Sequence, residues 1–103
     1  MSKVIVKQND FGYYLNFTVQ NHDGTVFNLA GYTITLNVWR ESRFPIILLA
    51  GACGIVVAAD GTCRYLVVTG DFPDEGMFKY ELEMTAVGEN ISTSTGDFTV
   101  RES

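Results

Sequence analysis

The feature of the sequence that most limits the possible folds is an alternation of apolar and polar side chains with a period of two residues. From Phe78 to Met84 every second residue is apolar, and the residues between them are Lys or Glu. The same period recurs over residues 13–20 and 33–39. Successive side chains of a β-strand point to opposite faces, so this pattern predicts strands with one buried face and one solvated face. No stretch of useful length repeats at the helical period, and we expect no substantial helix.

Turn-forming residues separate the alternating runs. Asp60-Gly61, Gly70-Asp71 and Gly88-Glu89-Asn90 tolerate the dihedral angles of tight turns. Strands are expected at residues 3–8, 12–20, 32–40, 46–50, 53–59, 62–69, 76–86 and 91–101. Short strands at this spacing predict an all-β fold, an immunoglobulin-like antiparallel β-sandwich of about 7–8 strands. A chain of 103 residues has the usual size of one domain, so residues 1–103 are expected to form a single sandwich.

The charge balance argues against two classes of partner. Seven Lys and Arg residues stand against twelve Asp and Glu residues, which gives a net charge of −5. Binding to nucleic acid or to an anionic membrane surface needs clustered cations, and the cations of this chain are scattered. The longest apolar run, residues 44–52, is too short to span a bilayer, and Lys7 interrupts the apolar stretch near the amino terminus. We therefore expect no nucleic acid partner, no membrane partner, no secretion signal, and folding in a cytoplasm.

Residue types that carry catalysis in other proteins are sparse. His22 is the only histidine, and it lies in a polar turn without the other members of a catalytic relay or a zinc site. The ten glycines occur singly and form no phosphate-binding loop. Carboxylate pairs at residues 74–75 and 81–83 fall in a turn and on an outward strand face. The sequence thus predicts a protein that is not an enzyme, with no catalytic residues, no metal and no cofactor.

Cys53 and Cys63 are expected to be free thiols. A hairpin that turns at Asp60-Gly61 would place Cys63 opposite Ala58, several residues along the ladder from Cys53. That separation corresponds to about 17 Å, whereas a disulfide needs Cα atoms within about 7 Å of each other. A reducing compartment also favours thiols. The alternative is a disulfide between the two residues.

Several segments of the chain follow one another in a characteristic order. They are Ala58-Ala59-Asp60-Gly61-Thr62-Cys63-Arg64-Tyr65, Thr69-Gly70-Asp71, Glu75-Gly76-Met77-Phe78-Lys79-Tyr80-Glu81-Leu82-Glu83 and Ser94-Thr95-Gly96-Asp97-Phe98-Thr99-Val100. Together they resemble the immunoglobulin-like domain family of phage baseplate upper proteins. Residues 8–12 and 23–31 match this family more loosely, so the resemblance covers nearly the whole chain.

This resemblance implies a structural role in a bacteriophage virion. The expected function is that of a non-enzymatic tail or baseplate component that docks other virion subunits through the surface of its β-sandwich. The expected partners are other virion proteins, or copies of the chain itself, within an oligomeric assembly. The expected location is the virion, which is assembled in the host cytoplasm.

One segment departs from the family pattern. Residues 44–50 are consecutively apolar where family members usually have polar, variable residues. A strand buried on both faces within the domain would explain this run, and partial burial against another subunit is the explanation favoured here. The candidate interface residues are Trp39, Phe44, Ile46, Ile47, Leu48 and Leu49. Trp39 is included because alternation places it on the face opposite the apolar residues of its strand, and Leu48→Asp is expected to abolish assembly without unfolding the domain.

Two other functions stay open. In a carbohydrate-binding module for host recognition, exposed aromatic rings would stack on sugars, and the candidate glycan-facing residues are Tyr14, Trp39 and Phe72. In a capsid decoration protein, the same fold would lie on the head of the particle. The residues do not distinguish this location from the tail.

Overall fold

The computed structural model describes residues 3–21, 23–40, 46–93 and 95–102. The strands in these residues are β1 (Val4–Lys7), β2 (Tyr14–Thr18), β3 (Thr33–Arg40), β4 (Ile46–Val57), β5 (Thr62–Leu66), β6 (Gly76–Ala86), β7 (Glu89–Ser92) and β8 (Gly96–Arg101). A single turn of 3₁₀ helix, η1 (Ala58–Asp60), joins β4 to β5. The described chain is thus all-β, which confirms the prediction from alternation.

Several of the expected strand boundaries are wrong, since β2 and β5 are shorter than the expected ranges 12–20 and 62–69, and two ranges are divided differently. Residues 46–50 and 53–59 were expected to form separate strands, but β4 is continuous because the backbone stays extended through Gly51. In contrast, residues 91–101 are divided between β7 and β8. Strand β7 begins early because a tight turn at Gly88, with φ of 78°, pairs Glu89 directly with the end of β6.

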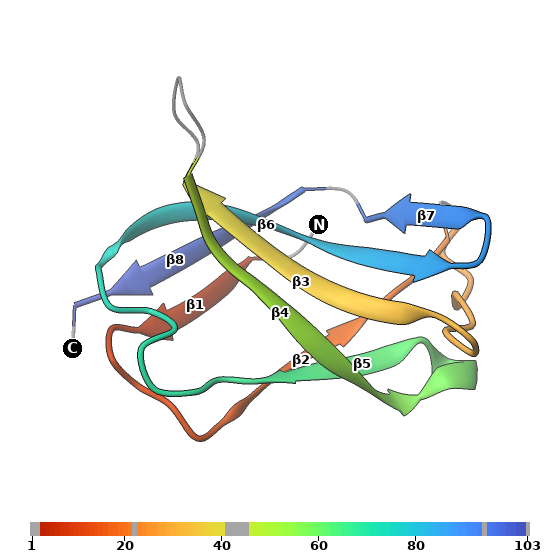
Figure 1. Cartoon of the computed structure of the whole chain (residues 1–103), viewed down its shortest axis with the longest axis horizontal. Helices are drawn as coiled ribbons and strands as arrows, with labels where there is room; N and C mark the ends of the chain where they lie inside the picture. Colours follow the sequence, from red (N-terminus) through yellow and green to blue (C-terminus); the bar gives the residue numbers. More distant parts are fainter. Residues whose placement is uncertain (1–2, 22, 41–45, 94, 103) are drawn as a thin grey trace.

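The strands form one curled sheet in the order β1-β8-β6-β3-β4-β5-β2, and β7 pairs with the far end of β6 (Figure 1). Strand β1 runs parallel to β8, whereas the other strand pairs are antiparallel. Strand β4 forms the corner of the curl, since it pairs with β3 as far as Cys53 and with β5 from Gly54 onward. The curl brings a larger portion (β1, β8, β6 and β3) to face a smaller portion (β5 and β2). The core lies between these two portions.

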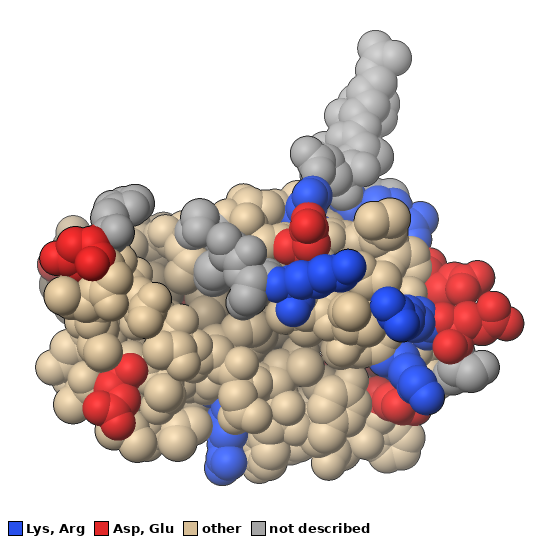
Figure 2. Space-filling model, turned by 180° about the vertical axis from the view of Figure 1, so that it is seen from behind, with Lys and Arg blue, Asp and Glu red and all other residues tan. Residues whose placement is uncertain are grey.

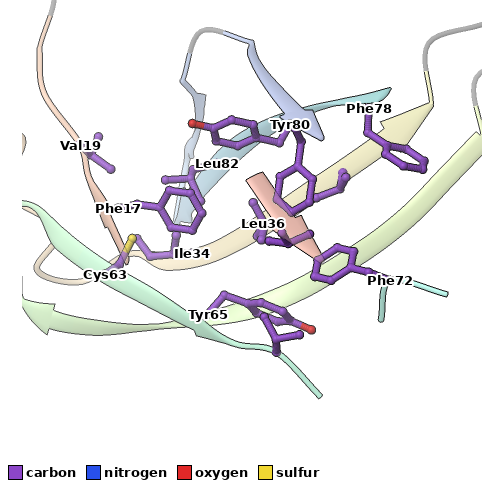
Figure 3. Close-up of a cluster of buried hydrophobic side chains, with 14 of the residues drawn as sticks. Phe17, Val19, Ile34, Leu36, Cys63, Tyr65, Phe72, Phe78, Tyr80 and Leu82 are labelled. Atoms are coloured by element: carbon purple, nitrogen blue, oxygen red, sulfur yellow. The ribbon is translucent and has the colours of Figure 1, made fainter. Parts of the chain in front are cut away.

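Aromatic rings fill the centre of the core. The ring centroid of Tyr80 on β6 lies 5.7 Å from that of Phe17 on β2 and 5.9 Å from that of Phe98 on β8. Phe72, in the loop after β5, packs at 5.1 Å from Phe98. Figure 3 shows Phe17, Phe72 and Tyr80 pointing into the same space. Buried aliphatic residues surround the rings: Val6, Val19, Leu29, Ile34, Leu36, Val38, Val67, Leu82, Met84 and Val100.

A β-bulge interrupts the alternation at the start of β4. Val38 pairs with Leu49, but Trp39 pairs with Ile47, so Leu48 is the extra residue of the bulge. As a result Leu48 and Leu49 are both half-buried and pack against the core, while Ile47 is exposed. The bulge therefore accounts for part of the consecutive apolar run that the sequence shows.

Gly51 lies where a side chain has no room. A Cβ atom at Gly51 would lie 2.3 Å from Cε1 of the buried Tyr65 ring, whereas a Cβ atom at Gly54 would meet nothing within 4 Å. We expect Gly51→Ala to lower the free energy of unfolding by about 1–3 kcal/mol, because the ring must move within a packed core. The matched control, Gly54→Ala, should change it by less than about 0.5 kcal/mol. Urea unfolding followed by circular dichroism measures both, and equal effects would contradict the packing of Tyr65 over Gly51.

Candidate interaction surface

Strand β4 has an outer side that is both apolar and exposed. Its 12 residues include no charged side chain and no hydrogen-bonding side chain other than the thiol of Cys53. The outward-facing residues, here called the β4 stripe, are Ile47, Ala50, Ala52, Gly54 and Val56. Ile47 is 70% exposed and Val56 is 50% exposed, so the two ends of the stripe carry large apolar side chains. The residues between these two ends have short side chains or none, so little side-chain volume projects from the middle of the stripe.

Trp39 extends the β4 stripe at its Ile47 end. Alternation along β3 turns Ile34, Leu36 and Val38 into the core and Trp39 to the outer face, which confirms the predicted orientation. The indole is half-buried, and Trp39 pairs with Ile47 on the neighbouring strand. A partly covered tryptophan beside an exposed isoleucine can bury further apolar area against a partner.

Of the other predicted interface residues, Leu48 lines a surface pocket together with Ile47 of the β4 stripe. Leu48 and Leu49 are partly buried, and the expectation that a partner covers the remainder of each side chain stays a prediction. The part that is buried packs against the core of the domain itself. The bulge is the physical reason, because it turns both residues toward the interior. Phe44 and the side chain of Ile46 lie outside the described residues. Trp39 and Ile47 are the predicted residues that the structure brings together on the outer face.

Arg64 and Tyr14 flank the β4 stripe on the side of the smaller portion. Arg64 on β5 pairs with Gly54 of the stripe and with Asn16 on β2. Its guanidinium carbon lies 3.9 Å from the centroid of the Tyr14 ring, a cation–π contact. Leu66, which pairs with Tyr14, is 44% exposed. Sequence reasoning missed Arg64, because alternation shows that it faces outward but does not show which residues of β2 and β4 lie beside it.

A polar band lies on the outer face of the larger portion, across β3 from the β4 stripe. Glu81 and Glu83 of β6 face outward there, between the buried residues of their strand. Farther along, Lys79 forms an ion pair with Asp97 at 2.6 Å, and this hydrogen bond lowers the pKa of Asp97. Figure 2 shows charged side chains of both signs interspersed on the back of the molecule. That face carries no large patch of one sign.

Phe72 is buried, so the prediction that it faces a glycan is wrong. Only 1% of Phe72 is exposed. The preceding residue, Asp71, accepts a hydrogen bond from the Tyr65 hydroxyl at 2.6 Å and another from the backbone N–H of Val68 at 2.9 Å. These bonds tie the loop to β5 and leave Phe72 in the core. Burial and the hydrogen bond to Asp71 raise the pKa of Tyr65.

Groups suited to metal binding do not gather in the part of the chain that the structure describes. Among those residues no cluster of three or more His, Cys, Asp or Glu side chains is placed to hold a metal ion. His22 lies outside them. Over the same ranges, no helix has the length and apolar character that a membrane crossing requires.

Comparison with known proteins did not identify a family for this chain. No protein-family model matches the chain. No curated protein matches it either. The proposal of a function therefore depends on two observations. They are the geometry of the outer surface and the resemblance of the sequence, mainly in residues 58–100, to the immunoglobulin-like domains of phage baseplate upper proteins.

Proposed function

We propose that this chain is a non-enzymatic structural protein of a bacteriophage virion, a tail or baseplate component that docks other virion subunits or copies of itself. The β4 stripe and Trp39 form the docking surface. The observation that carries the proposal is a 12-residue strand with no charged side chain whose outer side is open to solvent. The family resemblance of the sequence supports the assignment to a tail or baseplate.

The strand order supports an immunoglobulin-like sandwich as the finer description of the fold. The larger portion contains the order β8-β6-β3, and the smaller portion contains β4-β5-β2. In immunoglobulin-like sandwiches the corresponding orders are G-F-C and D-E-B. On this proposal the continuous β4 serves both sheets, which leaves its outer side at the exposed corner between them.

Burial of the β4 stripe against a partner would be favourable for a physical reason. Each exposed apolar side chain removed from water contributes roughly 25 cal/mol per Å² of area. The stripe has no charge to desolvate, and desolvation of imperfectly paired polar groups is the usual cost of an interface. Trp39 supplies a large apolar side chain of the kind that dominates binding energy. An elongated apolar surface along a strand, with one such anchor, fits a protein partner better than a small molecule.

Immunogold electron microscopy of phage particles that carry the gene tests the location. We expect gold-labelled antibody against the chain to mark the tail or baseplate of intact particles. Label over the head would instead support the capsid decoration protein. Absence of label from intact particles, with label retained on the purified chain, would contradict a virion location altogether.

The contact between Tyr14 and Arg64 favours one second candidate, a carbohydrate-binding module. The guanidinium of Arg64 covers one face of the partly exposed Tyr14 ring. A sugar would stack on the other face of the ring and accept hydrogen bonds from the guanidinium. Tyr14 and Trp39 lie on the outer faces of different portions, so they do not form one platform. Phe72 contributes nothing, since it is buried.

A glycan array followed by titration tests the carbohydrate-binding candidate. If the chain binds a glycan at this site, Tyr14→Ala should weaken binding at least about tenfold, which corresponds to roughly 1.4 kcal/mol. Trp39→Ala is the matched control and should leave binding unchanged. Saturable binding lost in both variants, or in neither, would place the glycan elsewhere.

A further inference from the structure

Cys53 and Cys63 lie beside each other, although the sequence predicts them about 17 Å apart. The chain between them turns through η1, and a register shift between Ile55 and Val57 places Cys63 opposite Ile55. Cys53 lies two residues before Ile55 on the same side of β4, so the two cysteines are diagonal neighbours on adjacent strands. Cα atoms in this arrangement are roughly 7–8 Å apart, so a disulfide requires β4 and β5 to shift slightly toward each other. The side chain of each cysteine shifts the pKa of the other, which indicates that the two thiols lie close together. The predicted separation is wrong because it assumed a two-residue turn at Asp60-Gly61 and no bulge, whereas η1 lengthens the turn and the bulge adds a further residue.

The two cysteines occupy the corner where β4 passes from the larger to the smaller portion. Cys53 pairs with Ile34 on β3, directly before β4 joins β5. Cys63 pairs with Phe17 on β2 and is only 1% exposed, and Figure 3 shows its sulfur within the core. Both residues are free thiols in this structure, and Cys53 is half-buried. A reagent in solvent therefore meets Cys53 first.

We propose that Cys53 and Cys63 are a modification site that oxidises to an intramolecular disulfide linking β4 to β5. The oxidant is a small disulfide such as oxidised glutathione. The Cys53 thiolate attacks one sulfur of the oxidant and releases one glutathione thiolate, and the Cys63 thiolate then attacks the Cys53 sulfur and releases the second. Each protein thiol loses its proton, one S–S bond forms in the protein, and the S–S bond of the oxidant is reduced.

Oxidation should accelerate as the pH rises. The neighbouring side chain of Cys63, together with burial, raises the pKa of Cys53. The thiolate of Cys53 is therefore scarce at neutral pH, and the thiolate is the form that attacks a disulfide. The pair is thus slow to oxidise in neutral solution and reacts once a sustained oxidising environment is present.

Mass spectrometry of the full chain tests this proposal. The folded protein is incubated with oxidised glutathione at mildly alkaline pH, quenched with acid, and then unfolded in guanidinium with iodoacetamide. We expect the loss of two hydrogen atoms and no alkylation. We also expect the melting temperature to rise by at least about 5 °C and to return when dithiothreitol is added, because the bond restricts the unfolded chain.

The Cys63→Ser variant provides the control, because it removes the second thiol and leaves Cys53 in place. It should accumulate one glutathione on Cys53, which shows that the oxidant reaches this residue. Two alkylated thiols in the wild-type chain after the treatment would overturn the proposal, whether or not the variant reacts. A wild-type chain with glutathione on Cys53 and an alkylated Cys63, or disulfide-linked dimers, would overturn it as well.

Discussion

Phe98→Ala is expected to lower the free energy of unfolding by about 3–5 kcal/mol, which is a large part of the total for a domain of this size. Phe98 is completely buried on β8, and its ring contacts Phe72 and Tyr80. Truncation would leave a cavity between the two portions of the curled sheet. The neighbouring rings of Phe72 and Tyr80 are held by different elements of the fold, so they cannot readily move together to fill it. Urea unfolding followed by circular dichroism measures the loss.

The next residue of the same strand gives the matched control for Phe98→Ala. Thr99 faces outward between Met77 and Ile5, so Thr99→Ala should change the free energy of unfolding by less than about 1 kcal/mol. A Phe98→Ala protein within about 1 kcal/mol of the wild type would show that the aromatic core contributes little to the stability of the domain.

If the chain is a virion component, as proposed, Ile47→Asp is expected to abolish its incorporation into the particle while leaving the domain folded. Ile47 is 70% exposed on the β4 stripe, so a carboxylate there stays hydrated in the free protein. In an apolar interface the same carboxylate would be desolvated, which costs several kcal/mol, and Arg40, which lines a pocket together with Ile47, would offset only part of that cost. Western blotting of purified particles made with the variant gene measures incorporation, and circular dichroism confirms the fold. Sedimentation velocity shows whether association between copies is lost as well.

The control for Ile47→Asp is Val87→Asp, which places the same charge outside the β4 stripe. Val87 is fully exposed at the turn between β6 and β7. Particles should incorporate the Val87→Asp chain at the wild-type level. Normal incorporation of Ile47→Asp, or equal losses in both variants, would rule out the β4 stripe as the docking surface.

Leu48→Asp, which the sequence suggests as a test of assembly, would not separate assembly from folding. The bulge turns Leu48 toward the core, where it packs against buried residues. A carboxylate at this position would destabilise the domain itself. A loss of assembly in that variant would therefore have two explanations, whereas Ile47 is free of this ambiguity.

Alternation predicted the parts of the fold in which one face of a strand is buried and the other is solvated. Strand β6 occupies the predicted range, and β3 differs from it by one residue. Trp39 faces outward as expected, because a strand that keeps its register keeps its faces. An uninterrupted apolar run has no alternation that would show which residues face the core. Neither the bulge at Leu48 nor the continuity of β4 could therefore be predicted from residues 46–57.

The parts of the site that were missed depend on how neighbouring strands align. Asp60-Gly61 indicates a turn, but not the register shift that places Cys63 opposite Ile55. The contact between Arg64 and Tyr14 depends on the pairing of β5 with β2, which are far apart in the sequence. A single sequence shows which face a side chain occupies and leaves open which strand lies beside it.

The parallel pairing of β1 with β8 has a mechanical consequence. Val4 pairs with Phe98 and Lys7 pairs with Arg101, so the first and last strands lie side by side and point the same way. Tension that pulls the two ends of the chain apart would slide these strands past each other in opposite directions. The evenly spaced hydrogen bonds between parallel strands would then share the load and have to break together rather than one after another. The pairing thus acts as a shear clamp against forces transmitted along the polypeptide.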